Sequence, residues 1–318
     1  MQAQGITPLR FAKSAWHLAL VAGLGIAAAR AQAQGGAQLF PQPFVVEHRI
    51  IQVDADGSTF EGAPVTDYYG GVWIVSVRPD GSRTVVDFAR REITEVRPGQ
   101  GTYSVLSFDR LAELTQRLRR AESGAPALPQ RHAAPREGGG GATPRVEELA
   151  PGTHGRFAAG RPLGAVAGRQ GVRAFHAVLD GETAGAAPGA PLEVEVWLDG
   201  RVRLSEKARK TLASFEGEVL DGSGGHGPRG LPRLMAAARE SADGAFPVRT
   251  ARALRAREDG TAVGALVDEA DRLEVLAQFP VELIEVSDGL RRVPHPLEVM
   301  VAWAEQEAEL TSRSAGKR

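Results

Sequence analysis

The chain has 318 residues, of which 42% are hydrophobic and only 6% aromatic, and its 38 basic and 39 acidic side chains give a formal net charge of −1 at pH 7. This balance excludes the basic footprint that a nucleic-acid-binding domain carries, so we expect no nucleic-acid partner. The lack of cysteine excludes disulfides, thiol catalysis and lipid attachment to an N-terminal cysteine.

The first 33 residues have the three parts of a cleavable signal peptide. Arg10 and Lys13 precede an apolar stretch over residues 18–29. Small residues then alternate at Ala29, Ala31 and Ala33. The apolar stretch holds about a dozen residues, fewer than the roughly 20 that a helix needs to cross a bilayer. We therefore predict a periplasmic or secreted protein that is not an integral membrane protein once residues 1–33 are removed. A retained membrane anchor is the alternative.

Residues 34–121 alternate β-rich runs with turn signals and end in a helix, which predicts the first half of a domain. The predicted strands cover residues 44–53, 68–78, 83–89, 91–97 and 102–107. Turn signals lie at Asp56-Gly57, Pro79-Asp80-Gly81 and Pro98-Gly99. Residues 109–121 space Leu111, Leu114 and Leu118 at three and four residues, which predicts an amphipathic helix. This order is typical of an antiparallel meander that leads into a helix.

Residues 122–171 change composition to Gly, Pro, Ala and Arg, with few large apolar side chains. Such a segment cannot bury enough apolar surface to offset the entropy of ordering, so it predicts a flexible insertion or linker. Within it, Glu147, Glu148 and Leu149 could form one helical turn.

Residues 172–318 predict the second half of the domain. Strands are predicted at 172–180, at 191–199, as a pair within 246–268 and as a pair within 273–287 that Pro280 interrupts; helices are predicted at 204–219, 231–241 and 297–310. Runs of strands followed by helices, without regular βαβ alternation, indicate an α+β fold with an antiparallel sheet.

No catalytic or metal-binding motif withstands inspection. The loop Asp221-Gly222-Ser223-Gly224-Gly225 resembles the surroundings of a serine-protease nucleophile, but the residue order differs. Asp54, Asp56 and Glu61 lack the twelve-residue spacing of a calcium loop. The histidines that follow residue 33 are too far apart along the chain to give the close ligand pair usual in zinc sites. We therefore expect no metal and no cofactor.

The strands and the helix start supply aromatic side chains that could line a cavity for an apolar ligand. The candidates are Trp73, Phe88, Tyr103, Phe108, Phe175 and Trp197. The alternative is that these six side chains only fill the core.

Four segments carry a resemblance to known proteins. They are YYGGVWIVSVRPDGSRTVVDFARREITEVRPGQGTYSVLSFDRLAEL, EVEVWLDGRV, DGAFPV and RRVPHPLEV. Their order resembles an exported bacterial domain of unknown function and is similar in layout to the LolA/LolB-like periplasmic half-barrels. The resemblance covers most of residues 44–310. It implies a curved, half-barrel-like sheet that wraps helices and shelters acyl chains.

Together these features predict a non-catalytic exported envelope protein that binds an apolar ligand, such as a lipid, or another envelope protein. Two alternatives remain. One is an exported hydrolase whose catalytic residues come from scattered segments, and the other is a structural component of the envelope.

Overall fold

The computed structural model describes residues 38–54, 58–123, 146–151, 166–179, 192–216, 231–255 and 262–315. The predicted signal peptide, most of the predicted insertion and the loop at residues 221–225 lie outside these ranges. Among the described residues, no helix is long and apolar enough to span a membrane.

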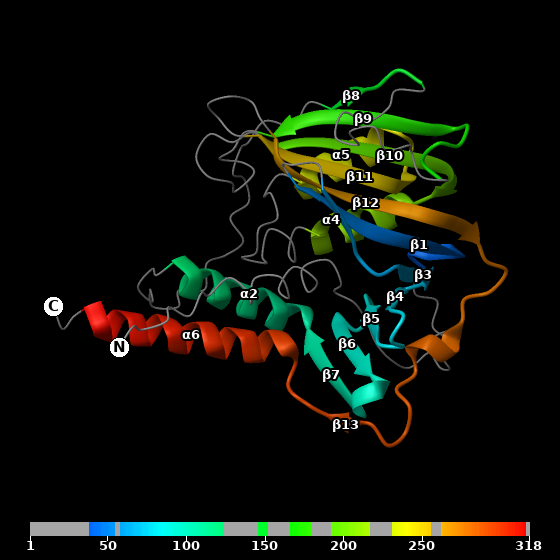
Figure 1. Ribbon diagram of the computed structural model, residues 1–318. Coiled ribbons are helices and arrows are strands. Elements are labelled where there is room, and N and C mark those ends of the chain that lie inside the picture. The colour runs from blue at the N-terminus through cyan, green and yellow to red at the C-terminus, as the bar shows by residue number, and fades with distance from the viewer. Residues whose placement is uncertain are drawn as a thin grey trace.

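The described strands form one large sheet (Figure 1). The strands are β1 (Phe40–Asp54), β2 (Thr59–Glu61), β3 (Val65–Gly71), β4 (Trp73–Val77), β5 (Arg83–Asp87), β6 (Glu92–Arg97), β7 (Thr102–Ser107), β8 (Glu147–Glu148), β9 (Val172–Leu179), β10 (Leu192–Arg203), β11 (Ala245–Arg255), β12 (Ala262–Val275) and β13 (Arg291–Arg292). Their order across the sheet is β13-β7-β6-β5-β4-β3-β1-β12-β11-β10-β9-β8, and β2 pairs with β1. The sheet is open, and together with the helices it confirms the α+β class.

Both predicted halves of the chain contribute to this one sheet. Strand β1 lies at the centre, antiparallel to β3 on one side and to β12 on the other. Every strand pair is antiparallel except β13 with β7. The two halves meet along the pairing of β1 with β12. This pairing is long, since it runs from Phe44 opposite Val275 to Asp54 opposite Gly264. The pairing register shifts between Glu47 and His48, which marks a β-bulge.

The predicted strand at residues 68–78 is two strands. Tyr69 pairs with Ile74 and Gly70 with Trp73, so β3 and β4 form a tight hairpin. Gly71 has a φ of 60°, a left-handed conformation that glycine adopts at little cost. The run of apolar residues hid this turn, because its only signal is the Gly70-Gly71 pair.

The helices lie mainly on one side of the sheet, which we call the inner face. They are α2 (Phe108–Ser123), α4 (Glu206–Glu216), α5 (Leu231–Ser241) and α6 (Pro296–Ala315). The inner face carries Phe44, Tyr69, Val86 and Leu106, which the strand register places on one side. Figure 1 shows α2 and α4 within the curve of the sheet, and α2 and α6 side by side.

The opposite, outer face is covered at β3 to β5 by the chain that follows β12 (Figure 1). Phe279 packs on Gly70 and stacks on Trp73, with ring centroids 6.1 Å apart. Arg83 donates to the carbonyl oxygens of Leu283 and Glu285. The predicted strand pair at residues 273–287 is therefore wrong. Strand β12 ends at Val275, and a 3-10 helix, η6 (Val281–Ile284), follows.

Two shorter elements complete the fold. A 3-10 helix, η3 (Pro98–Gln100), joins β6 to β7. Glu147 and Glu148 form the edge strand β8, which pairs with β9, so the predicted helical turn there is wrong. The open edge of the sheet supplies backbone hydrogen-bond partners that the sequence of this segment does not reveal.

Candidate functional site

A row of five polar side chains crosses the inner face. Asp67 lies opposite Ser76, and further pairings continue through Thr84 and Glu95 to Ser104. Directly opposed residues of an antiparallel pair project to the same face, so these five side chains form one line over β3 to β7, which we call the polar row. Four of them are buried, and Thr84 is fully enclosed.

A second line of side chains, which we call the apolar rung, crosses the same five strands beside the polar row. Its members, in the same strand order, are Tyr69, Ile74, Val86, Ile93 and Leu106. At its β3 end, Tyr69 stacks on Phe44 with ring centroids 4.4 Å apart, and Phe246 meets both rings edge-on at 5.0 and 5.2 Å. Phe40 completes this aromatic cluster, 5.4 Å from Tyr69. A polar line and an apolar line therefore run side by side beneath the helices.

Two atoms of the polar row are buried without a hydrogen-bond partner, namely Thr84 Oγ1 and Asp67 Oδ1. Leaving such an atom unsatisfied costs about 1–3 kcal/mol. Folded proteins satisfy most buried polar atoms, so each exception needs a physical explanation, such as a bound water or ligand. The row therefore has hydrogen-bonding capacity that the described residues leave unused.

His48 closes the β1 end of the row. Its Nδ1 lies 2.7 Å from Asp268 Oδ1, and its Nε2 lies 3.2 Å from Asp67 Oδ2. Burial opposes a charge on the imidazole, but the two carboxylates outweigh it and raise the pKa of His48 well above its usual value. The ring is therefore a cation held between two anions.

Helices α4 and α5 place a second ion pair over this end of the inner face. Arg239 on α5 donates to both carboxylate oxygens of Glu216 on α4, at 2.8 and 3.1 Å. Burial, helped by the nearby charge of Asp67, raises the pKa of Tyr69 well above its usual value, although Arg239 acts in the opposite direction. Tyr69 therefore remains a neutral phenol at the centre of the aromatic cluster.

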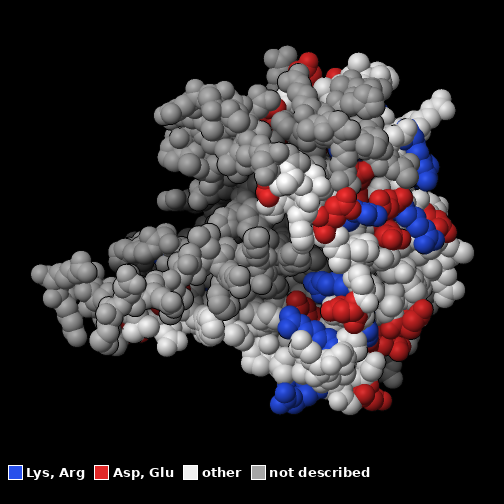
Figure 2. Space-filling model, viewed as in Figure 1, with Lys and Arg blue, Asp and Glu red and all other residues white. Residues whose placement is uncertain are grey.

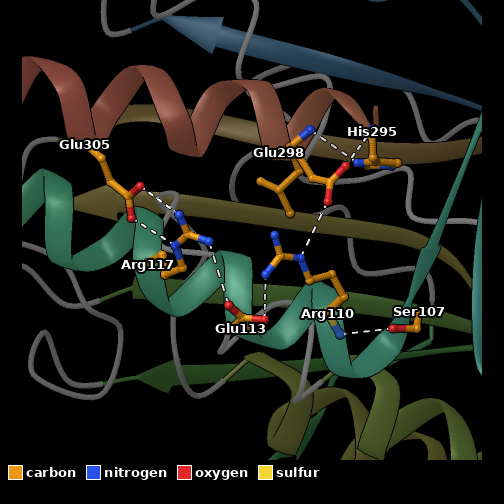
Figure 3. Close-up of polar contacts among 8 residues, drawn as sticks. Ser107, Arg110, Glu113, Arg117, His295, Glu298 and Glu305 are labelled. Carbon is orange, nitrogen blue, oxygen red and sulfur yellow. Dashed lines mark hydrogen bonds and ion pairs between the residues drawn. The ribbon is translucent and has the colours of Figure 1, made fainter. Parts of the chain in front are cut away.

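The other end of the row meets the start of α6. Glu95 accepts a hydrogen bond from Arg97 at 2.6 Å. Burial lowers the pKa of His295, helped by Arg97 and opposed by the acidic Glu95 and Glu298. A neutral His295 fits its role as helix cap, because its Nδ1 accepts a hydrogen bond from Leu297 N at 3.2 Å (Figure 3).

The structure separates most of the six predicted aromatic residues. Phe88 and Phe108 contact each other with centroids 6.0 Å apart, and both contact Phe215 of α4. Trp73 lies on the outer face against Phe279. The other three lie elsewhere: Phe175 belongs to the cluster under α5, Trp197 lies beneath the guanidinium of Arg249, and Tyr103 is half-buried on β7.

Sequence reasoning missed the polar row and the aromatic cluster. A signal was present, because a polar and an apolar residue lie two positions apart in each strand, as Ser76 and Ile74 do, or Glu95 and Ile93. Both members of each pair are at least partly buried, so the polar residues do not mark a solvent-facing side of the strand. Only the strand register shows that the polar members lie in one line.

Another group of polar contacts lies at the surface. Figure 2 shows acidic and basic side chains alternating in a band over β1 and β12 on the side turned to the viewer. Arg49 of this region pairs with Glu61 at 3.1 Å and with Asp271 at 2.5 Å, and each of the three side chains is about a third exposed or more. Exposed pairs of this kind contribute little to stability. In the described ranges no group of three or more possible ligand side chains is placed to hold a metal ion.

No known family model and no curated protein matches the chain. Solved structures do match. An uncharacterized conserved protein from Thermus thermophilus matches with 9% identity and a TM-score of 0.32, over 80% of this chain and 91% of its own length. PNGF-II matches with 9% identity and a TM-score of 0.32, over 83% of this chain but 33% of PNGF-II. A LolA superfamily protein from Nitrosomonas europaea matches with 8% identity and a TM-score of 0.25, over 77% and 91% of the two chains. TM-scores this low do not establish a shared fold or role.

Proposed function

We propose that this protein is an exported envelope protein that binds a lipid-like, amphipathic ligand between the inner face and the helices, without catalysing a reaction. The observation that carries the proposal is the polar row with its two unsatisfied atoms, Thr84 Oγ1 and Asp67 Oδ1. A core that served folding alone would gain nothing from a line of polar groups in this position. A ligand with a polar group would satisfy them.

The two lines on the inner face favour a ligand with two chemistries. The apolar rung and the aromatic cluster offer a surface for an alkyl or ring system, while the polar row offers hydrogen bonds on the neighbouring rung. Asp67 is an acceptor, so it selects a ligand group that donates, such as a hydroxyl or an ammonium. His48 already neutralises part of the carboxylate charge, which favours a neutral donor such as a hydroxyl.

The helical cover suits a ligand that must enter and leave. Arg239 and Glu216 join α4 to α5 rather than to the sheet. The sheet is held by its own strand pairing and is open at β8 and β13. Displacing the helices would therefore break side-chain packing without breaking the backbone ladder of the sheet.

The experiment is native mass spectrometry of the mature protein purified from its own envelope fraction, followed by solvent extraction. A reproducible bound mass that yields a molecule with an apolar body and a hydroxyl or amine group is the expected result. A protein that carries only water in a well-diffracting crystal and no bound mass would overturn the proposal, because water would then satisfy the polar row.

A further inference from the structure

Arg252 of β11 belongs to the inner face of the sheet. It lies two positions from Thr250, which is opposite Asp268 of β12, so the side chains of Arg252, Thr250 and Asp268 project to one side. On that side Asp268 contacts His48, and His48 contacts Asp67 of the polar row. Arg252 therefore shares a face with the polar row and the aromatic cluster.

The residues level with Arg252 run from the helical cover to solvent. On β10, Val194 is opposite Arg252, is fully buried and belongs to the cluster under α5. On the other side Leu266 of β12 is opposite Arg252, and Gln52 of β1 is opposite Leu266. Gln52 is exposed, whereas Arg252 is partly buried. The arginine thus lies where the covered part of the inner face meets solvent.

Arg252 has no direct partner in the described part of the chain. No hydrogen bond, ion pair or ring contact joins its guanidinium to another described residue. Arginines of the two neighbouring strands do have partners, because Arg49 of β1 donates to Asp271 at 2.7 Å and Arg272 of β12 donates to Glu274 at 2.9 Å. Both of those ion pairs are more exposed to water than Arg252 is.

The charge of Arg252 is only partly compensated. Burial lowers its pKa, and the attraction of Asp268 opposes this effect without cancelling it. Asp268 already accepts a hydrogen bond from His48 at 2.7 Å. For Arg239 burial acts in the same direction, but Glu216 outweighs it and raises the pKa. Arginine keeps its proton in proteins, so a partly dehydrated cation remains at position 252, and an anion beside it would be stabilised.

We propose that Arg252 binds the anionic group, a carboxylate or a phosphate, of the ligand whose apolar body lies over the aromatic cluster. This inference rests on the proposed function and narrows the ligand to acidic or zwitterionic amphiphiles. A guanidinium suits both anions, because it donates two parallel N–H bonds to a pair of oxygens. The donor group of the same ligand, a hydroxyl or an ammonium, faces Asp67.

The inner face orders these parts along β1. Phe44 is opposite Tyr69 in the aromatic cluster, and Gln52, eight residues further along β1, is level with Arg252. Eight residues of strand span about 26 Å at about 3.3 Å per residue. Asp67, opposite Val46, lies between the two ends. A ligand in this orientation has its tail in the covered region and its anionic group near solvent.

The test measures binding of single-chain probes to the lipid-free full chain by calorimetry. The probes are decyl phosphate, decanoate and decanol, which share one alkyl chain and differ in the group at its end. We expect one or both anions to bind the wild type about tenfold or more tightly than decanol, as a charge-assisted hydrogen bond would give. The tighter anion identifies the group that Arg252 accepts.

Arg252→Met should reduce the preference for the anions to about twofold or less while keeping the affinity for decanol. Arg252→Lys keeps the charge without the paired donors and should retain part of the preference. Arg272→Met is the matched control, since it removes an exposed arginine of β12, and its preference should equal that of the wild type.

The outcomes separate this inference from the proposed function. Equal affinity of the wild type for all three probes, or an unchanged preference in Arg252→Met, overturns the role of Arg252 alone. Inorganic phosphate that binds as tightly as decyl phosphate also overturns it, because the ligand would then need no apolar body. A wild type that binds none of the three probes contradicts the proposed function, and this inference falls with it.

Unfolding of the ligand-free protein gives a readout that does not depend on a probe. Arg252→Met should leave the free energy of unfolding unchanged or raise it, because methionine keeps the apolar stem and removes a charge without a direct partner. Arg239→Met should lower it, because Glu216 then loses its partner. If Arg252→Met destabilises the protein as much as Arg239→Met does, Arg252 serves the fold and the proposal is overturned.

Discussion

His48 on β1 donates a hydrogen bond from Nδ1 to Asp268 Oδ1 on β12, 2.7 Å away, across the strand pair that joins the two halves of the sheet. On its other side the ring lies 3.2 Å from Asp67 of β3. One imidazolium therefore links three neighbouring strands at the centre of the fold. Its position beside the β-bulge at Glu47 and His48 makes it sensitive to the register of β1.

The stability of the protein should fall as pH rises above neutrality because of His48. Its pKa is raised in the folded state, despite the opposing effect of burial, by Asp268 and Asp67. The contribution of His48 to the free energy of unfolding is therefore fully present below the pKa of the unfolded chain, about 6.5. It is lost as pH rises through the pKa of the folded protein. Urea unfolding at a series of pH values should show this loss in the wild type and a flatter profile in His48→Gln. Equal slopes in the two proteins would contradict the assignment.

His295 should give the opposite pH dependence at the start of α6. Its folded pKa is lowered by burial and by Arg97. The contribution of neutral His295 to the free energy of unfolding is present above the pKa of the unfolded chain, about 6.5. It is lost as pH falls from there towards the lower pKa of the folded protein. Protonation would also remove the acceptor that Leu297 N uses. Amide exchange in the first turn of α6, corrected for the intrinsic pH dependence, should accelerate on acidification in the wild type. An unchanged protection factor would argue against the cap.

Gly70→Ala should destabilise the protein, because a Cβ at this position would lie 2.3 Å from a ring carbon of Phe279. Overpacking of this kind costs about 1–3 kcal/mol. Gly99→Ala is the matched control, since nothing lies within 4 Å of its Cβ, and it should change the free energy of unfolding by about 0.5 kcal/mol or less. Phe279→Leu should recover part of the loss in the double variant. If Gly70→Ala is neutral, the chain after β12 does not pack on the outer face as described.

Arg239→Met should destabilise the cover formed by α4 and α5. The change removes a buried guanidinium and leaves the Glu216 carboxylate without its two hydrogen bonds. Removing one partner of a buried ion pair lowers the free energy of unfolding by about 3–5 kcal/mol. Because Glu216 is partly exposed, we expect a decrease near or below the lower end of this range. Lys210→Met, which removes an exposed pair with Glu206 on α4, should have no measurable effect. Chemical unfolding of the three proteins compares these outcomes.

Much of the fold follows from local patterns in the sequence. The predicted range of α5 agrees with the structure, and β5, β6 and β7 were found because turn residues separate short β-branched runs. The errors arose where tertiary contacts outweigh local signals. The β3–β4 turn depends on Gly71 inside an apolar run, and residues after Val275 look like strands because they are apolar, although they pack on the outer face.

The candidate site was harder to predict than the fold. The large aromatics stood out in the sequence, yet Phe88 with Phe108 is the only pair of rings described as stacked or edge-on among the six candidates. The polar row depends on five strands paired in one register, from Asp67 to Ser104, and no local pattern encodes that alignment. The link between His48 and Asp268 joins residues 220 positions apart, which puts it beyond reach of spacing rules.

The most direct test of the ligand proposal compares Thr84→Val with Thr94→Val. Thr84 lies on the inner face with an unsatisfied hydroxyl, whereas the equally buried Thr94 lies on the outer face. Both chains are purified from the envelope, and the ligand-bound fraction is measured by native mass spectrometry. The account predicts about fivefold weaker retention in Thr84→Val, the value for one lost hydrogen bond of about 1 kcal/mol, with unfolding stability of the ligand-free protein unchanged or raised. It predicts unchanged retention in Thr94→Val. Equal retention in both variants, or no bound mass in the wild type, would contradict it.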